Sequence, residues 1–190
     1  MNSIPFLHIE EAKESARLLY RALAFHQIHL PGAADSIGLQ QTQELMAQSF
    51  RCAGWKDLTR RVELQDSVVY LDEGGSLRSS RDKLAEHLHA IIGPHVPLET
   101  VRAAVGLAAV GCSGRERSHA RRFFSLCPAK TAEQWGKLMQ VESAYSYHSR
   151  YNKGRTVYEI SMLEYARQAA VAEILGTPKP RKPRRPKAGS

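Results

Sequence analysis

The chain has 190 residues, with 27 Lys and Arg against 19 Asp and Glu, which gives a formal net charge of +8 and a sequence pI near 9.6. Hydrophobic residues make up 43% of the chain, which predicts a folded globular protein. The mean hydropathy is -0.39, and no stretch approaches the roughly 18 consecutive apolar residues of a membrane-spanning helix, so a membrane protein is not expected.

Cysteine usage and the first residues predict a cytoplasmic protein. The chain has three cysteines, an odd number, and they are widely spaced at Cys52, Cys112 and Cys127. This pattern favours reduced thiols over a disulfide framework. A secretory signal begins with a basic segment that is followed by an apolar one. The first 14 residues lack this order and soon become acidic, so no secretory signal is expected.

Three amphipathic segments predict a helical N-terminal module over residues 1–62. Apolar residues recur at helical spacing in residues 10–27 and again in residues 39–50, and a shorter segment begins at Trp55. Within residues 12–58 these helices carry a spaced pattern at Ala12, Lys13, Ala16, Leu19, Leu39, Gln43, Glu44, Leu45, Ala47, Trp55 and Leu58.

This pattern resembles a small helical module found in plasmid, phage and glyoxalase-related proteins. The resemblance covers about a quarter of the chain. It implies a helical accessory module. It does not imply glyoxalase activity, because the metal-site residues of such a domain are not recognisable downstream.

Residues 63–176 predict a body of helices with two short β-hairpins. Residues 68–71 are β-branched and aromatic and precede a Gly-Gly turn and residues 76–79, while residues 145–151 and 156–160 alternate around a turn at 152–154. Helices are predicted between and after them, at 80–92, 98–110, 115–126, 132–143 and 161–175. The expected fold class is therefore mainly α with two short β-hairpins, in which the N-terminal module precedes a winged-helix-like body.

Two of these helices form a helix-turn-helix candidate. Residues 98–110 and 115–126 are separated by a break that contains Gly111 and Gly114, and Ser113 with Glu116 forms a capping-box pattern at the second helix. In that second helix, residues 115, 118, 119 and 122 share one face by their spacing. Arginine suits such a face because its guanidinium can pair with the guanine edge or clamp a phosphate.

The excess charge is concentrated at the C-terminal end. Residues 178–187 contain six basic residues, four prolines and no acid, and without them the net charge falls to +2. Their composition predicts a disordered basic tail over residues 177–190. Such a run is typical of an arm that displaces counterions from nucleic acid, although a solubilising tail without a specific partner would have the same composition.

These features predict a DNA-binding regulatory or accessory protein of a mobile element, with nucleic acid as the partner and transcription regulation as a role. DNA is favoured over RNA because an RNP-type strand, a GXXG loop and a zinc knuckle are not found. The predicted DNA-binding residues are Arg115, Arg117, Ser118, His119, Arg121 and Arg122 in the helix, Arg150, Lys153 and Arg155 in the wing, and Lys179, Arg181, Lys182, Arg184, Arg185 and Lys187 in the tail.

Other functions stay open alongside DNA binding. An adaptor could use the N-terminal helices and residues 98–110 to bind an acidic protein, and a homodimer and a weak nuclease are also left open. Enzyme activity is not predicted, because the sequence lacks GxSxG, HExxH, Walker and GxGxxG motifs. A cofactor or metal is not expected either, since His87 and His89 point apart on a helix.

Overall fold

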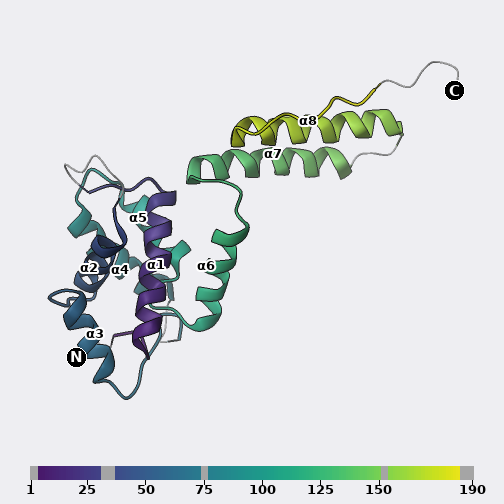
Figure 1. Ribbon diagram of the computed structural model, residues 1–190. Helices are drawn as coiled ribbons and strands as arrows, with labels where there is room; N and C mark the ends of the chain where they lie inside the picture. The colour runs from purple at the N-terminus through teal and green to yellow at the C-terminus, as the bar shows by residue number, and fades with distance from the viewer. Residues whose placement is uncertain (1–3, 31–36, 74–76, 151–153, 185–190) are drawn as a thin grey trace, which may run out of the picture. The chain divides into compact units, whose positions relative to one another are not determined.

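The computed structural model describes residues 4–30, 37–73, 77–150 and 154–184, and within these ranges it contains eight helices and no strand (Figure 1). The chain divides into two compact units, Met1–Leu126 and Cys127–Ser190. None of the helices in the described ranges is long and apolar enough to cross a membrane. The helices are α1 (Ile9–Phe25), α2 (Leu39–Ser49), α3 (Trp55–Glu63), α4 (Leu77–Ile92), α5 (Leu98–Ala108), α6 (Gly114–Leu126), α7 (Ala132–Arg150) and α8 (Val157–Leu175).

In the first unit, α1 is the central helix. It packs against α5 and α2, and also against α3 and α6, while α4 covers α5 and α2. Apolar residues recur along α1 every three or four positions, so one side of the helix can be buried against several neighbours. The largest fully buried apolar side chains of this core are Phe6, Leu19, Leu23, Ile28, Met46, Leu58, Leu88, Ile92, Val101, Val105 and Val110.

The predicted boundary after residue 62 lies inside this first unit. The helices of the predicted N-terminal module share one core with α4 and α5. A local contact fixes the connection between α2 and α3: the Glu44 carboxylate accepts a hydrogen bond from the Trp55 backbone N–H at 2.9 Å.

The first predicted hairpin is wrong. Residues 68–73 form no strand in the structure, and α4 already begins at Leu77. The segment instead makes contacts with distant residues: the Leu71 N–H donates to the Gly111 carbonyl at 2.9 Å, and the Tyr70 hydroxyl donates to the Glu11 carboxylate at 2.9 Å. Tyr70 and Leu71, which contributed to the strand prediction, instead join the segment to α1 and to the chain before α6. Residues 74–76, which include the Gly-Gly turn, lie outside the described residues.

The second predicted hairpin is also wrong, and with it the winged-helix-like body. Residues 145–150 belong to α7, and α8 begins at Val157. Thr156 and Glu159 form a capping box, in which the Thr156 hydroxyl accepts from the Glu159 N–H at 3.2 Å and the Glu159 carboxylate accepts from the Thr156 N–H at 2.7 Å. This reciprocal pair satisfies two backbone donors, so the β-branched residues start a helix and not a strand.

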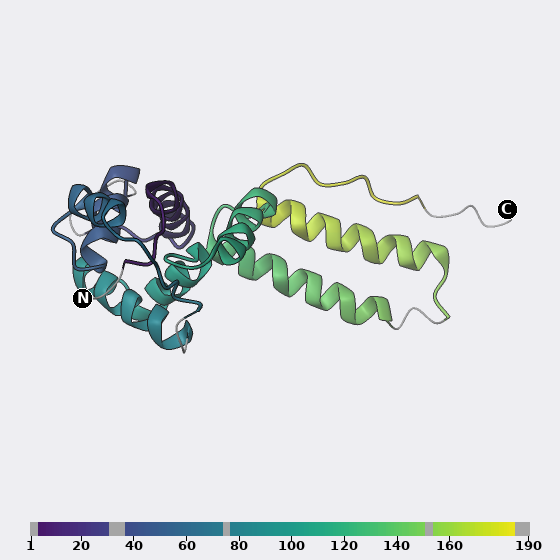
Figure 2. The same cartoon turned by 90° about the horizontal axis from the view of Figure 1, so that it is seen from below.

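The second unit consists of the α7–α8 pair and the chain that follows it. Arg167 of α8 joins the two helices by an ion pair to Glu142 of α7 at 2.6 Å. It also pairs with Glu164 within α8 at 2.7 Å. Gly176 ends α8 in the left-handed conformation with φ of 67°. Residues 177–184 then run alongside α8 without regular secondary structure, and Lys179 pairs with Glu173 at 2.8 Å (Figures 1 and 2).

Candidate nucleic-acid interface

Helix α6 has a buried face and an exposed face, and the predicted DNA-binding residues divide between them. Arg117, Ala120 and Phe124 lie at helical spacing on the side that faces the core, and Arg117 is only 4% exposed. On the opposite side, the side chains of Arg115, Ser118, His119 and Arg122 are all exposed. The structure therefore brings these four predicted residues together on one solvent-facing surface.

The Arg117 side chain forms ion pairs and a hydrogen bond with other residues inside the protein. Its guanidinium pairs with Glu11 at 2.6 Å and with Glu14 at 3.2 Å, and it donates to the Cys112 carbonyl at 2.6 Å. The guanidinium also lies over the Tyr70 ring, 5.8 Å from its centroid. A side chain held in this way cannot reach a ligand outside, so Arg117 is not part of the exposed interface.

Glu11 is the acidic centre of this buried cluster. Burial alone would raise the pKa of its carboxyl, but hydrogen bonds from Leu7, Arg117 and Tyr70 outweigh the burial, so the pKa lies below its usual value. Glu11 is thus held ionised beside Arg117.

Arg121 lies at the edge of the exposed face. Its Nε atom is 3.1 Å from a Glu14 carboxylate oxygen, and its side chain is 58% exposed. This ion pair is made through Nε, so the Nη groups of the guanidinium can donate to an external partner. By contrast, Arg115 and Arg122 form no ion pair with any carboxylate among the described residues.

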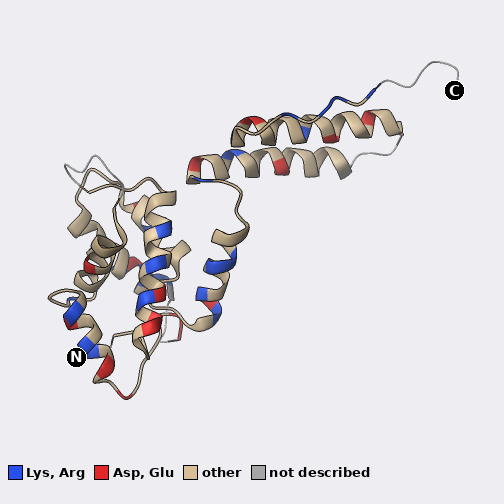
Figure 3. Cartoon of the chain, viewed as in Figure 1, with Lys and Arg blue, Asp and Glu red and all other residues tan. Residues whose placement is uncertain are grey.

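Helix α1 adds two cations that the sequence analysis did not select. Glu14, Arg17 and Arg21 follow one another at helical spacing, and α1 packs against α6. The guanidinium of Arg21 lies 5.9 Å from the centroid of the Phe124 ring of α6. Figure 3 shows the basic segments of α1 and α6 in blue on these two neighbouring helices. We call the set Arg17, Arg21, Arg115, Arg121 and Arg122 the cationic face.

The residues predicted for the wing are placed differently. Arg155 is half-buried just before α8 and donates to the His148 carbonyl at 3.5 Å. Arg150 is the last residue of α7, and its side chain and the whole of Lys153 lie outside the described residues. With α7 and α8 in place of a hairpin, the structure contains no basic wing tip in its described part.

The tail residues that are described stay accessible. Arg181, Lys182 and Arg184 are exposed, and Lys179 is exposed although it pairs with Glu173. Arg185 and Lys187 lie outside the described residues.

Charge is distributed very unevenly between the two units. The first unit contains 15 basic and 14 acidic residues, while the second contains 12 basic and five acidic residues, a net charge of +7. The first unit is therefore nearly neutral. Its cationic face is positive because Glu11 and Glu14 pair with the buried Arg117, while Arg115 and Arg122 are exposed and Arg121 shares Glu14.

The described residues contain no group of three His, Cys, Asp or Glu side chains that could hold a metal ion. The three cysteines are unpaired, and burial raises the pKa of the Cys112 thiol, which keeps it protonated. No family model matches the sequence, and neither a comparison with curated proteins nor one with solved structures finds a match.

Proposed function

We propose that the protein binds DNA through the cationic face, as a regulatory or accessory protein. The observation that supports this proposal is the division of α6, in which Arg115 and Arg122 are exposed and lack a described carboxylate partner while Arg117 is buried and pairs with Glu11 and Glu14 of α1. The proposal includes a mobile element as the source of this function, as the sequence pattern of residues 12–58 predicts.

The exposed residues of α6 suit direct readout of base pairs. An α-helix fits the major groove of B-DNA, and an arginine can form two hydrogen bonds with the guanine edge. Arg115 and Arg122 lie two helical turns apart on the outer side of α6, with Ser118 and His119 between them. In this account Arg115 and Arg122 contact base edges, and Ser118 and His119 add shorter polar contacts.

The cations beside this helix suit phosphate contacts. Arg17 and Arg21 of α1 are exposed next to α6, where they would hold the backbone on one side of the groove. Phosphate contacts of this kind fix orientation and contribute affinity without sequence preference. The second unit with its tail supplies the remaining positive charge, and its contribution should depend steeply on salt concentration.

The experiment compares variants by fluorescence polarisation. A preferred duplex is first selected from a random library with the full chain, and its Kd and that of a scrambled duplex are then measured at several salt concentrations. For each of Arg115→Ala and Arg122→Ala we expect the preference for the selected duplex to fall by about 5- to 150-fold, since one bidentate arginine–guanine pair contributes about 1–3 kcal/mol of discrimination.

Removing the tail should have a different effect. Deletion of residues 178–190 should weaken binding to both duplexes equally and lower the salt slope by about 0.9 for every phosphate that the tail neutralises in the full chain. Lys56→Ala, which removes an exposed cation of α3 outside the cationic face, is the matched control and should change neither preference nor slope.

Two outcomes would contradict the proposal. The first is a failure to select any preferred duplex. The second is full sequence preference in both arginine variants together with complete loss of binding on removal of the tail. Either result would support the adaptor function instead, in which the N-terminal helices and residues 98–110 bind an acidic protein and DNA is bound only through the charge of the tail.

A further inference from the structure

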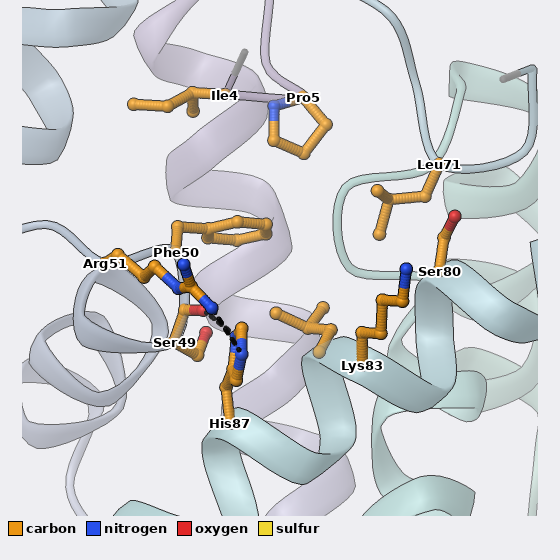
Figure 4. Close-up of a pocket in the computed structure, with 10 residues that line it drawn as sticks. Ile4, Pro5, Ser49, Phe50, Arg51, Leu71, Ser80, Lys83 and His87 are labelled. Carbon is orange, nitrogen blue, oxygen red and sulfur yellow. Dashed lines mark hydrogen bonds between the residues drawn. The ribbon is translucent and has the colours of Figure 1, made fainter. Parts of the chain in front are cut away.

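The first unit contains a pocket that the proposed DNA interface does not use. It has a volume of about 220 Å³ and lies between the N-terminal segment, the end of α2 and the first turns of α4 (Figure 4). Its apolar lining is made by Ile4, Pro5, Phe50, Leu71 and Leu84.

The pocket also carries two cations. Arg51 follows the end of α2 and Lys83 belongs to α4, and Figure 4 shows them on different sides of the pocket. Both are exposed, and no described lining residue is acidic. The acidic neighbours of Lys83 along α4, Asp82 and Glu86, pair with Arg102 instead. Positive charge in the pocket is therefore not neutralised by the described residues around it.

His87 orients one of these cations. Its Nδ1 atom lies 3.1 Å from the Ser49 carbonyl oxygen, which can only accept, so Nδ1 carries the hydrogen. Its Nε2 atom lies 3.3 Å from Nη2 of Arg51, which can only donate, so Nε2 is the acceptor. This neutral ring holds one N–H of the guanidinium and leaves the other donors of Arg51 for a ligand.

The backbone at Arg51 is strained. Its φ is 59°, in the left-handed region that favours glycine, directly after Phe50, the C-cap of α2. Glycine would relieve this strain, but it would remove the guanidinium from the pocket. Gln27 has a similar φ of 55° after the end of α1 and lies outside the pocket, so it offers a matched comparison.

We propose that this pocket binds a small organic carboxylate with an apolar body. The carboxylate would lie between Arg51 and Lys83, close to Ser80 in the first turn of α4, where the helix dipole also favours negative charge. The apolar body would contact Phe50, Leu71 and the other apolar lining side chains. A bare inorganic anion would leave that apolar surface unused, so the lining favours an organic ligand.

The test uses 3-phenylpropionate as the probe, with isothermal titration calorimetry on the full chain. We expect saturable binding of 3-phenylpropionate and at least tenfold weaker binding of 3-phenylpropanol, acetate and inorganic phosphate, because each lacks either the carboxylate or the apolar body. Absence of binding for 3-phenylpropionate, benzoate and 4-methylpentanoate would overturn the proposal. Phosphate or the neutral alcohol binding as tightly as the carboxylate would also overturn it.

Two glycine substitutions separate the role of the side chain from that of the backbone. Arg51→Gly should raise Tm by relieving the left-handed strain and should weaken binding of 3-phenylpropionate at least tenfold. Gln27→Gly should also raise Tm but leave binding unchanged. Lys83→Gln, an exposed substitution on α4, should weaken binding without loss of stability. Undiminished binding in both Arg51→Gly and Lys83→Gln would contradict the assigned site, whatever the result of the DNA experiments.

Discussion

The buried Arg117 is expected to contribute strongly to the stability of the first unit. Its guanidinium joins α6 to Glu11 and Glu14 of α1, and only 5% of its side chain is exposed. Arg117→Ala would remove the cationic partner of Glu11 and leave Glu14 with the exposed Arg121 alone, so we expect a loss of about 3–5 kcal/mol in the free energy of unfolding, measured by urea denaturation.

Arg121 is the matched control, because it pairs with the same Glu14 but is 58% exposed. Arg121→Ala should cost less than about 1 kcal/mol. Equal losses for the two variants would show that burial does not distinguish them.

Gly111 is a second position where one residue decides the local structure. Its φ is +70°, and an added Cβ would lie 2.7 Å from Cγ of Pro5 and 3.1 Å from Cδ1 of Leu71. Gly111→Ala should therefore lower the free energy of unfolding by more than about 1 kcal/mol, the cost of the left-handed backbone alone.

Gly106 in α5 has nothing within 4 Å of its added Cβ. Gly106→Ala should stabilise the protein by roughly 0.5–1 kcal/mol, since alanine favours the helix. Chemical denaturation of both variants checks the opposite signs, and a stabilised Gly111→Ala variant would contradict the packing described here.

The exposed positions of α6 could be predicted from the sequence, but the burial of Arg117 and its ion pairs with α1 could not. Its spacing from Ala120 and Phe124 was the available signal that it belongs to the buried face. Its partners Glu11 and Glu14 are more than 100 residues away in sequence, and no local pattern identifies them. The same distance explains why Arg17 and Arg21 were missed.

At the scale of elements, helices with a clear apolar face were predicted within about two residues. α1, α2 and α5 are of this kind, and each buries that face in the first unit. α7 and α8 are weakly amphipathic, so the local alternation around residues 145–160 favoured strands. The contacts of Arg167 with Glu142 and Glu164, together with the capping box, stabilise helices there instead.

The capping box at the start of α8 can be tested directly. Thr156→Ala removes the acceptor for the Glu159 N–H and should destabilise the start of α8 by about 0.5–2 kcal/mol. Hydrogen exchange of the Glu159 amide should accelerate accordingly. Ser161→Ala, whose hydroxyl only donates to the Val157 carbonyl within the same helix, is the control and should leave this exchange nearly unchanged.

At the scale of the whole molecule, acid stability follows from the buried carboxylates. Burial alone would raise the pKa of Asp72, but hydrogen bonds from Ser113 outweigh it and lower that pKa, as those from Leu7, Arg117 and Tyr70 do for Glu11. A carboxyl with a lowered folded-state pKa stabilises the protein fully above its unfolded-state value, and that stabilisation is lost as pH falls through the folded-state value.

The free energy of unfolding should therefore decrease as pH falls below about 4.5, near the ordinary value for a glutamate. Urea denaturation at pH 3 to 7 measures this dependence. Glu11→Gln and Asp72→Asn should flatten it, while the exposed Glu63→Gln should not. An unchanged slope in the first two variants would contradict the assignment of acid sensitivity to these groups.

DNA binding as proposed requires that α6 contacts DNA with its outer side. The most direct measurement is an NMR titration that follows the arginine Nε–Hε signals of the full chain as the selected duplex is added. We expect the signals of Arg115 and Arg122 to shift and the signal of the buried Arg117 to stay unchanged. Shifts confined to Arg181 and Arg184 in the tail, with α6 unaffected, would contradict it.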